Sequence, residues 1–495
     1  MVEKYHVGDR ISIGSALATV KYAGTIHVWP ETAAYGVEWD DPTRGKNDGC
    51  VDAVRYFTCL ARGGSFVKAS NSKIDARRLF SDAVEARYAG ASNRDALRHT
   101  ISFGSKTVEQ VGFEKLNMIT HDYQNLTLLL LDRQCILEAA VVPALHKLKN
   151  LDLSYNLLAL WTDVSRILAQ MPNLKSLNLN GNRISGGQLR NVPPKLQQLS
   201  LSDVRLKPQQ LPLDECTHVT KLELAGNKWT DDDMDVWSPP SSVLTIDLSY
   251  NALTQVPAFI GGGKVREVLL HNNKIAEFDC LRVYPGVALL DVRFNLFSTL
   301  SAIDRVSVTF PNLIELKITH CSALDGLLVE EMTMLLLGRL DCRVLSGSVR
   351  GIAKLNGSAV LAEEVRNGEL YVAGQIHAGR AVLENPVRLA YLRNKYSLHA
   401  QHNQARENNK TIALQFFNSC DPRVEVFARR FMRHNTVLRL KGVISKHILR
   451  PLLLFSVYCH PHDDEIVPKR YLDDDIAQLQ SYGLVSNHRM YICYD

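Results

Sequence analysis

The sequence lacks the features that mark nucleic-acid-binding, secreted or membrane proteins. Its 57 lysines and arginines against 52 acidic residues leave a net charge of only +5, whereas nucleic-acid-binding domains usually have an isoelectric point above about 9. Its most apolar runs, 126–131 and 451–459, are far shorter than the roughly 20 residues that cross a bilayer. The polar N-terminal residues show no apolar signal core. We expect neither a nucleic-acid nor a membrane partner.

The ten cysteines contain no Cys-x-x-Cys pair, which excludes zinc-finger and thioredoxin-type spacing. The segment 459–465 carries metal-competent side chains, but its proline and acidic residues suit the end of a strand better than a metal site. We therefore expect no metal, no cofactor and a reduced, cytoplasmic setting.

Motifs of covalent catalysis are also missing, since neither Gly-x-Ser-x-Gly nor His-Glu-x-x-His occurs. The run Gly261–Lys264 resembles a phosphate loop, but Ala258 and Val265 stand where that motif requires glycine and a hydroxyl residue. The acidic runs 231–233 and 473–475 suit solvated loops or a helix N-terminus. We expect a binding protein and not an enzyme.

What the sequence does have is an internal repeat within residues 106–345, of the form apolar-x-apolar-x-x-Asn. The asparagine position is filled in chain order by Gln134, Asn156, Asn182, Val204, Asn227, Asn251, Asn273, Asn295 and Cys321. These positions are 22, 26, 22, 23, 24, 22, 22 and 26 residues apart, within the period of leucine-rich repeats. Each asparagine can bond backbone groups of the turn that follows a short strand. One repeat cannot bury its own apolar face, so we expect an α/β solenoid of stacked repeats.

The regions around the repeats differ in composition. Residues 1–80 hold short β-prone runs between Gly, Pro and Asp, which predicts a small all-β barrel, and residues 81–105 resemble a helical or loose linker. Residues 346–410 lose the repeat and predict a poorly packed connector with some helix. Residues 411–495 predict an α+β ubiquitin-like roll, with a buried strand at 452–459. The chain is thus expected to be multidomain.

The sharpest local motif is Gly45-Lys46-Asn47-Asp48-Gly49. Two glycines allow a tight loop that a ligand can approach closely. Lys46 can meet a carboxylate as a point charge on a flexible stem, and Asn47 can donate and accept hydrogen bonds at once. The loop therefore suits an extended acidic peptide with a free terminal carboxylate. A solvated surface turn is the alternative.

The surroundings of this loop resemble a CAP-Gly domain. The resemblance rests on Gly24-Thr-Ile, Val37-Glu-Trp-Asp-Asp-Pro42, Arg55-Tyr-Phe-Thr-Cys59 and Gly63-Gly-Ser-Phe66. That family binds C-terminal Glu-Glu-Tyr or Glu-Glu-Phe tails, notably of α-tubulin. The resemblance implies that the Gly45–Gly49 loop, through Lys46 and Asn47, engages the acidic tail. It also implies that Trp29 and Phe66 hold its terminal ring, core packing being the alternative.

One position departs from the CAP-Gly pattern. Many members of that family carry a tryptophan two residues before the glycine matched by Gly36, where this chain has Ala34. Tyr35 is the neighbour that would replace the missing ring in part. The departure predicts a weaker grip on the tail.

The order of CAP-Gly domain, leucine-rich repeats and ubiquitin-like domain resembles the tubulin-folding cofactor E family over most of the chain, the segment Phe103–Phe113 included. The resemblance implies a cytoplasmic, cytoskeleton-associated protein that captures α-tubulin in assembly and dissociation of the tubulin heterodimer. The CAP-Gly domain would hold the tail and the repeats the body. The implied partners are α-tubulin, the heterodimer and other tubulin-folding cofactors, especially B, also C and D. The proteasome is a further candidate.

The middle residues of the repeat strands should face the concave side of the solenoid. They are Asp152, Asn178, Ser200, Glu223, Asp247, Leu269, Asp291 and Lys317. Four of the eight are acidic, which favours a basic patch on the partner. The alternative is that Leu-Asp-Leu-Ser is a common repeat wording that serves solubility.

Two other functions stay open. A microtubule-lattice adaptor would use the CAP-Gly domain on the polymer and the repeats for cargo, although the sequence shows no heptad coiled coil and no long basic Ser/Pro-rich flank. A ubiquitin-pathway scaffold without chaperone activity would act through residues 411–495, which end without a Gly-Gly tail and so suit a fixed domain.

Overall fold

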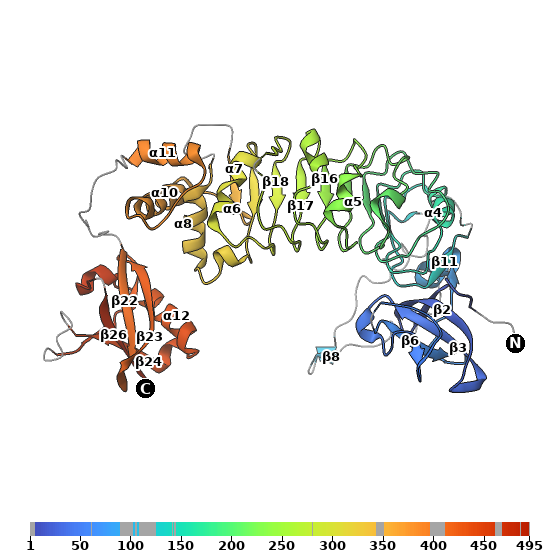
Figure 1. Cartoon of the computed structure of the whole chain (residues 1–495), viewed down its shortest axis with the longest axis horizontal. Helices are drawn as coiled ribbons and strands as arrows, with labels where there is room; N and C mark the ends of the chain where they lie inside the picture. Colours follow the sequence, from blue (N-terminus) through green and yellow to red (C-terminus); the bar gives the residue numbers. More distant parts are fainter. Residues whose placement is uncertain are drawn as a thin grey trace. The chain divides into compact units, whose positions relative to one another are not determined.

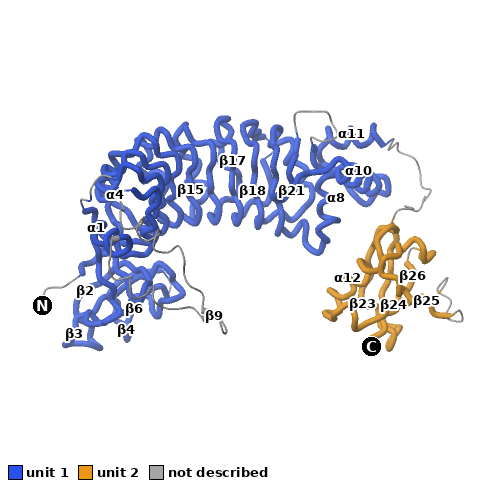
Figure 2. The backbone as a smooth tube through the Cα atoms, turned by 180° about the vertical axis from the view of Figure 1, so that it is seen from behind, with its two compact units in different colours: residues 1–398 blue, residues 399–495 orange. Residues whose placement is uncertain are grey.

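The computed structural model describes residues 5–494 apart from 61, 90–101, 104–105, 108–124, 141, 143–144, 280, 343–350, 397–410, 461–467 and 486. The chain divides into two compact units, residues 1–398 and 399–495, which Figure 2 colours separately. Most residues of the segments 103–113 and 459–465 lie outside the described residues. No helix among the described residues has the length and apolar character to span a membrane.

The first unit begins with a small β structure. Its four-stranded antiparallel sheet has the order β1 (Arg10–Ile13), β2 (Ala16–Ile26), β3 (Trp29–Trp39) and β6 (Gly64–Lys68). Residues on one face of these strands, which alternate along each strand, are buried together. This core consists of Tyr5, Ile11, Ile13, Ala18, Val20, Tyr35, Val37 and Trp39. The all-β N-terminal domain predicted from the sequence is confirmed.

The chain enters the repeats through elements that belong to the repeat core. Strand β7 (Arg78–Leu79) pairs in parallel with β11 (Ile136–Glu138). Helix α1 (Phe80–Val84) places its buried side chains in the same apolar cluster as the repeat leucines, and a π-helical turn, η2 (Glu85–Ala89), follows. The start of the predicted linker is therefore packed on the end of the solenoid. A separate short pair, β8 (Ser102–Phe103) with β9 (Lys106–Thr107), lies further along.

The middle of the chain forms one 11-stranded sheet, whose strands lie side by side in Figure 1. In order they are β10 (Leu128–Leu130), β12 (Asn150–Asp152), β13 (Ser176–Asn178), β14 (Gln198–Ser200), β15 (Lys221–Glu223), β16 (Thr245–Asp247), β17 (Glu267–Leu269), β18 (Leu289–Asp291), β19 (Glu315–Lys317), β20 (Lys354–Leu355) and β21 (Ser358–Ala359). Neighbours pair in parallel as far as β20, and β21 turns back antiparallel. The predicted leucine-rich repeat solenoid is confirmed.

The asparagine of each repeat forms the predicted ladder. Asn182 is fully buried, and its Nδ2 donates to the carbonyls of Leu153 and Leu179, each at 2.9 Å. Its Oδ1 accepts the backbone N–H of Asn156 at 3.2 Å. Buried backbone groups need partners, so this one side chain joins two repeats. The donation to a carbonyl of its own repeat and one of the preceding repeat recurs at Asn227, Asn251, Asn273 and Asn295.

Short helices and turns close the repeats behind the strands. They are α4 (Trp161–Leu168), η4 (Pro208–Gln210), α5 (Asp231–Asp235), η5 (Ala258–Gly262), α6 (Leu300–Asp304), α7 (Val306–Thr309), η6 (Ser322–Leu324) and α8 (Val329–Arg339). Their apolar side chains join the same buried cluster as the strands. The opposite face of the sheet is therefore not covered by these helices, and its side chains point outward.

The segment 346–410, expected to be a poorly packed connector, is folded where it is described. Strands β20 and β21 extend the repeat sheet, and Asn356 accepts the backbone N–H of Ile318 at 2.7 Å as a repeat asparagine does. Helices α10 (Ala362–His377) and α11 (Pro386–Tyr396) follow. The expectation of poor packing was therefore wrong.

Close backbone approach and buried ion pairs hold these helices. A Cβ on Gly338 of α8 would lie 2.3 Å from the carbonyl oxygen of Gly368 in α10, so only glycine allows this contact. Arg339 pairs with Asp304 at 2.8 Å, and Arg388 pairs with Glu369 at 3.0 Å, all four nearly inaccessible to solvent. Neither feature has a periodic sequence signature.

The second unit is an α+β roll. Its sheet has the order β23 (Asp421–Met432), β22 (Thr411–Asn418), β26 (His488–Tyr494), β24 (Phe455–Cys459) and β25 (Arg470–Tyr471), with β22 and β26 parallel. Helix α12 (Val437–Ile448) buries Val437, Leu440, Val443 and Ile444. The ubiquitin-like order of elements is confirmed, and two short turns, η7 (Leu452–Leu454) and η9 (Leu479–Tyr482), accompany it. The predicted strand 452–459 is too long, because η7 leaves Leu453 91% exposed before β24 begins.

Candidate functional site

The Gly45–Gly49 loop is held against strand β6 by backbone hydrogen bonds. The N–H groups of Lys46 and Asn47 donate to the carbonyl of Gly64 at 2.7 and 3.0 Å, and Gly64 donates back to the carbonyl of Asn47 at 2.9 Å. After the loop, β4 (Cys50–Val51) turns back on β5 (Val54–Arg55). The loop backbone is thus fixed by the domain itself.

The two glycines of the loop are required by packing. A Cβ on Gly45 would lie 1.7 Å from the carbonyl oxygen of Arg62. Gly49 has a left-handed φ of +95°, and a Cβ there would lie 2.1 Å from the carbonyl oxygen of Phe57. These contacts explain both glycines without a ligand, and they keep the loop close to its own domain.

The three polar residues of the loop differ in whether their side chains already have a partner within the domain. Asn47 Oδ1 accepts the N–H of Gly49 at 3.1 Å, so its acceptor closes the turn. Asp48 forms an ion pair with Arg55 at 2.8 Å, and the Arg55 hydrogen bond holds the pKa of Asp48 below its usual value. The Lys46 side chain is exposed and has no acidic partner in the described part of the chain. Lys46 is therefore the uncompensated charge of this loop.

Aromatic rings line strand β6 beside the loop. Phe66 is half-buried, with ring centroids 5.3 Å from Phe57 and 5.5 Å from Tyr56, both edge-on. The Tyr56 hydroxyl accepts the backbone N–H of His27 at 2.9 Å. Tyr56 lies in the Arg55–Cys59 motif, but no role was predicted for it from the sequence. The structure brings Phe66 close to the loop through Phe57.

Trp29 lies elsewhere on the domain. It begins β3, and the Lys68 ammonium is 5.3 Å from its ring centroid, at the end of β6 away from Gly64. No contact in the described structure joins it to the Gly45–Gly49 loop. A role for Trp29 in holding the terminal ring of a tail stays a prediction.

Tyr35 does not replace the missing tryptophan. It is only 3% exposed and packs edge-on against Tyr5, with ring centroids 5.4 Å apart. Successive residues of a strand point to opposite faces, so Tyr35 belongs to the barrel core. Ala34, on the other face, is itself buried. The expectation of partial replacement was wrong.

The four acidic residues expected in the middle of the repeat strands are instead the last residues of those strands, and two of them close the turns that follow. Asp152 accepts the N–H of Ser154 at 2.8 Å, and Asp247 accepts that of Ser249 at 2.9 Å. Such short-range bonds are typical of Asp before a turn. They give a structural reason for the Leu-Asp-Leu-Ser wording.

The other two acidic residues of this face have cationic partners. Asp291 is 2% exposed and pairs with Arg293 at 2.6 Å. Glu223 pairs with Lys221 at 2.6 Å and accepts the Ser200 hydroxyl at 2.7 Å. Burial alone would raise the pKa of Glu223, but the Lys221 and Ser200 hydrogen bonds hold it below its usual value. A role in binding stays a prediction for all four acidic residues.

A second row of residues runs beside the asparagine ladder and was not anticipated. The residue before each asparagine position has a left-handed backbone, with φ between 50° and 72°: Arg133, Tyr155, Gly181, Asp203, Gly226, Tyr250, Asn272, Phe294 and His320. Tyr250 is 59% exposed and Phe294 44% exposed, and their rings contact His271 and His320. The signal was the recurrence of an aromatic residue at one repeat position.

Comparison with known proteins finds one domain family and several relatives over most of the chain. Residues 7–72 match the CAP-Gly domain family. The chain is 30% identical to Protein PAC2 of Saccharomyces cerevisiae, over 74% of this chain and 75% of that protein. It is 32% identical to tubulin-specific chaperone E of Mus musculus, over 97% and 96% of the two chains. The solved C-terminal ubiquitin-like domain of mouse tubulin-specific chaperone E is 15% identical, with a TM-score of 0.17, over 19% of this chain and 95% of that domain. By its identities of 30% and 32% to the first two proteins, over most of both lengths, the chain belongs to the tubulin-specific chaperone E family.

Proposed function

We propose that this protein is a tubulin-folding cofactor that captures α-tubulin during assembly and dissociation of the tubulin heterodimer. The Gly45–Gly49 loop takes the acidic C-terminal tail, and the strand face of the repeats takes the body of the subunit. Membership of a family whose mouse relative is named a tubulin-specific chaperone supports this. The observation that carries it is Lys46, an exposed cation without an acidic partner in the described structure, on a loop whose backbone is already fixed.

Two contacts on one subunit explain how such a protein could act without covalent chemistry. Binding at one site raises the effective concentration at the second, so two weak sites give a firm grip. A separated α-tubulin held in this way is stabilised relative to the heterodimer, because the equilibrium shifts by the difference in binding free energy. The protein works in the cytoplasm beside the cytoskeleton, with cofactor B and also cofactors C and D as partners, and it is not an enzyme.

The first experiment mixes the full chain with native tubulin heterodimer, with and without cofactor B, and separates the species by size exclusion. An α-tubulin complex with loss of β-tubulin is the expected result. An intact heterodimer, with this chain instead pelleting with microtubules, would contradict the proposal and favour the lattice adaptor. A pull-down of proteasomes with the full chain separates the ubiquitin-pathway scaffold from both.

The role of the loop is tested by Lys46→Ala. We expect about a tenfold weaker affinity for a peptide ending in Glu-Glu-Tyr, since the variant loses one charge-assisted contact worth roughly 1.5 kcal/mol. Lys73→Ala is the matched control, because Lys73 is another exposed lysine of the same domain without an acidic partner among the described residues. Equal affinities for the two variants would remove Lys46 from the site.

The role of the strand face is tested by Asp247→Asn. Asparagine keeps the oxygen that closes the turn onto Ser249 but removes the charge, so the fold is preserved. We expect weaker binding of α-tubulin and unchanged binding of the tail peptide. Asp232→Asn is the control, because Asp232 is exposed on α5 and not on a strand. Unchanged α-tubulin binding by Asp247→Asn would leave that acidic residue with its structural role alone.

A further inference from the structure

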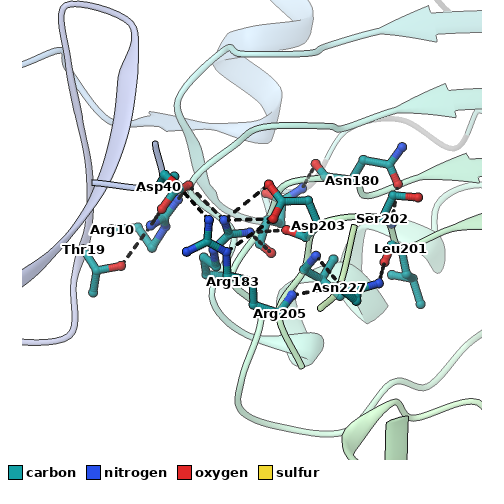
Figure 3. A network of polar contacts seen from close by, with 12 residues as sticks. Arg10, Thr19, Asp40, Asn180, Arg183, Leu201, Ser202, Asp203, Arg205 and Asn227 are labelled. Atoms are coloured by element: carbon teal, nitrogen blue, oxygen red, sulfur yellow. Dashed lines mark hydrogen bonds and ion pairs between the residues drawn. The ribbon is translucent and has the colours of Figure 1, made fainter. Parts of the chain in front are cut away.

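Asp40 of the CAP-Gly domain contacts the repeats directly. Asp40 follows β3 directly, and its carboxylate accepts two hydrogen bonds from Arg10, at 2.8 and 2.6 Å. From the repeats, Arg183 Nη2 lies 3.6 Å from the same carboxylate, and Arg205 Nη2 donates to the Asp40 backbone carbonyl at 2.7 Å. Figure 3 shows these side chains converging on Asp40. Both domains thus contact the same residue.

The charges at this contact are well shielded from water. The side chains of Arg10, Arg183 and Asp40 are 2%, 14% and 18% exposed. Burial alone would raise the pKa of Asp40, but the hydrogen bonds and charge of Arg10, with the charges of Arg183 and Arg205, hold it below its usual value. Ion pairs removed from water depend strongly on the presence of every partner.

A second acidic residue orients the two repeat arginines. Arg183 Nη1 donates to the backbone carbonyl of Asp203, and Arg205 Nε donates to its carboxylate at 3.3 Å. Asp203 belongs to the left-handed row beside the asparagine ladder. Its own N–H donates to Ala225 of the next repeat at 2.8 Å. The repeat side of the contact is therefore held by the solenoid and does not depend on the CAP-Gly domain for its geometry.

The two arginines occupy the same place in successive repeats, directly after Asn182 and Val204. Lys228 occupies that place in the next repeat, after Asn227. It is exposed and has no acidic partner within the described part of the chain. Position in the repeat alone thus does not create the contact, and Lys228 offers a matched control for it.

The chain connection supplies another attachment between the two domains. Strand β7 pairs with β11 of the repeats, and Arg78 N–H donates to the Cys135 carbonyl at 3.0 Å. Beside it lies a cavity of about 290 Å³ lined by Ser12 and Asp75 of the CAP-Gly side and Tyr155 of the repeats. This cavity leaves the packing around β7 incomplete, although helix α1 buries Phe80 in the repeat core. The Asp40 contact adds a second attachment between the two domains.

Asp40 is also connected to the tail-binding loop by a short, bonded turn. The next residue, Asp41, caps η1 (Pro42–Arg44) by accepting the Thr43 N–H. Gly45 then donates its N–H to the Pro42 carbonyl at 3.1 Å. The position of Asp40 is therefore linked to the start of the Gly45–Gly49 loop through this hydrogen-bonded turn.

We propose that Asp40, held between Arg10 of its own domain and Arg183 and Arg205 of the repeats, is a positioning residue that locks the CAP-Gly domain onto the solenoid. The tail-binding loop is then presented in one orientation to a partner whose body lies on the repeats. The lock itself is independent of the proposed function. Its consequence for tubulin binding rests on that function.

The lock is tested in the full chain by the double variant Arg183→Gln, Arg205→Gln, which leaves the Arg10–Asp40 pair intact. Spin labels carried by unnatural residues at Thr25 and Lys274, both exposed, report the distance between the domains. We expect one narrow distance distribution in the parent chain, a broad one in the double variant and a narrow one in Lys228→Gln. A narrow, unchanged distribution in the double variant, or a broad one in the parent chain, overturns the proposal.

The consequence for binding is measured separately. Affinity for a peptide ending in Glu-Glu-Tyr should be unchanged in the double variant, which also shows that its CAP-Gly domain is folded. Affinity for α-tubulin released from the heterodimer should fall about tenfold, because rigid pre-alignment of two sites is lost. A double variant with a broad distance distribution but parental α-tubulin affinity would overturn the positioning role. A parent chain that binds neither peptide nor tubulin would instead contradict the proposed function. The distance measurement would still show whether the arginines hold the CAP-Gly domain in one orientation.

Discussion

At the scale of single residues, the positions that fix the backbone of the Gly45–Gly49 loop differ from the position proposed to bind the tail. The two glycines allow close packing of the backbone, Asp48 forms an ion pair with Arg55, and Asn47 accepts a hydrogen bond that closes its own turn. The motif could be recognised from the sequence, because two glycines around polar residues are distinctive. The sequence could not show which side chains of the motif stay free to bind a ligand, because Arg55 and Arg62 are brought to the loop only by the fold. Substitutions of the glycines therefore test the stability of the domain, and substitution of Lys46 tests its binding of the tail.

Gly45→Ala should destabilise the CAP-Gly domain without removing any polar group. The added Cβ meets the Arg62 carbonyl oxygen at 1.7 Å, and backbone on both sides leaves little room to relax. We expect a loss of about 3 kcal/mol in the free energy of unfolding, at the upper end for overpacking. Hydrogen exchange of β2 and β3 measures it. In Gly262→Ala the Cβ meets nothing within 4 Å, and a change there as large as at Gly45 would contradict the steric argument.

The cysteines should differ sharply in reactivity. Burial raises the pKa of Cys216 and of Cys342 to about 12, whereas Cys420 is exposed. The thiolate is the reactive form, so brief alkylation near pH 8 should modify Cys420 and spare the two buried thiols. Peptide mass spectrometry reads the sites, with urea-unfolded protein as the fully reactive control. Equal modification of Cys216 and Cys420 in the folded chain would contradict the burial.

At the scale of elements, the repeat is the part of the fold that the sequence specifies most directly. A strand, a turn and an asparagine recur with one period, and each asparagine links backbone groups of two repeats. Some helix was predicted in the segment 351–396, but its close packing was not, because helix α10 packs on α8 through a pair of glycines and because Arg388 and Glu369 pair from distant positions. Side chains whose partners lie far away in sequence leave no local pattern.

Asn182→Ala should cost more than an ordinary loss of one hydrogen bond. It leaves the carbonyls of Leu153 and Leu179 and the N–H of Asn156 without this partner in a buried site. We expect a loss of about 3 kcal/mol, because three buried hydrogen bonds that each contribute roughly 1 kcal/mol are removed, although the Leu153 carbonyl keeps its bond from Asn156 Nδ2. Urea denaturation followed by circular dichroism measures it.

Asn312→Ala is the control for that variant. Its side chain makes one hydrogen bond, from Nδ2 to the Pro285 carbonyl at 2.9 Å, near the surface. We expect a loss of about 1 kcal/mol or less there. Equal losses in the two variants would show that the ladder contributes no more than any other hydrogen bond.

At the scale of the whole molecule, the chain folds into two compact units. The CAP-Gly domain and the repeats share one unit, joined by β7, by helix α1 and by the arginines around Asp40. The ubiquitin-like unit has its own buried side chains on α12 and on the strands that face it. The sequence indicated the domains through changes of pattern. It could not show which of them share a unit, because Asp40 and Arg183 lie in separate motifs.

This division predicts two separable thermal transitions in the full chain. Leu440 in α12 and Leu222 in β15 are both fully buried, and truncating either to alanine should cost about 3 kcal/mol. Because sites in separate cores without shared partners act independently, Leu440→Ala should lower only the transition of residues 399–495. Leu222→Ala should lower only that of residues 1–398. Differential scanning calorimetry measures both, and hydrogen exchange assigns each transition to its residues. A single transition lowered equally by both variants would mean that the two units unfold together, and their separate cores would then not be independent sources of stability.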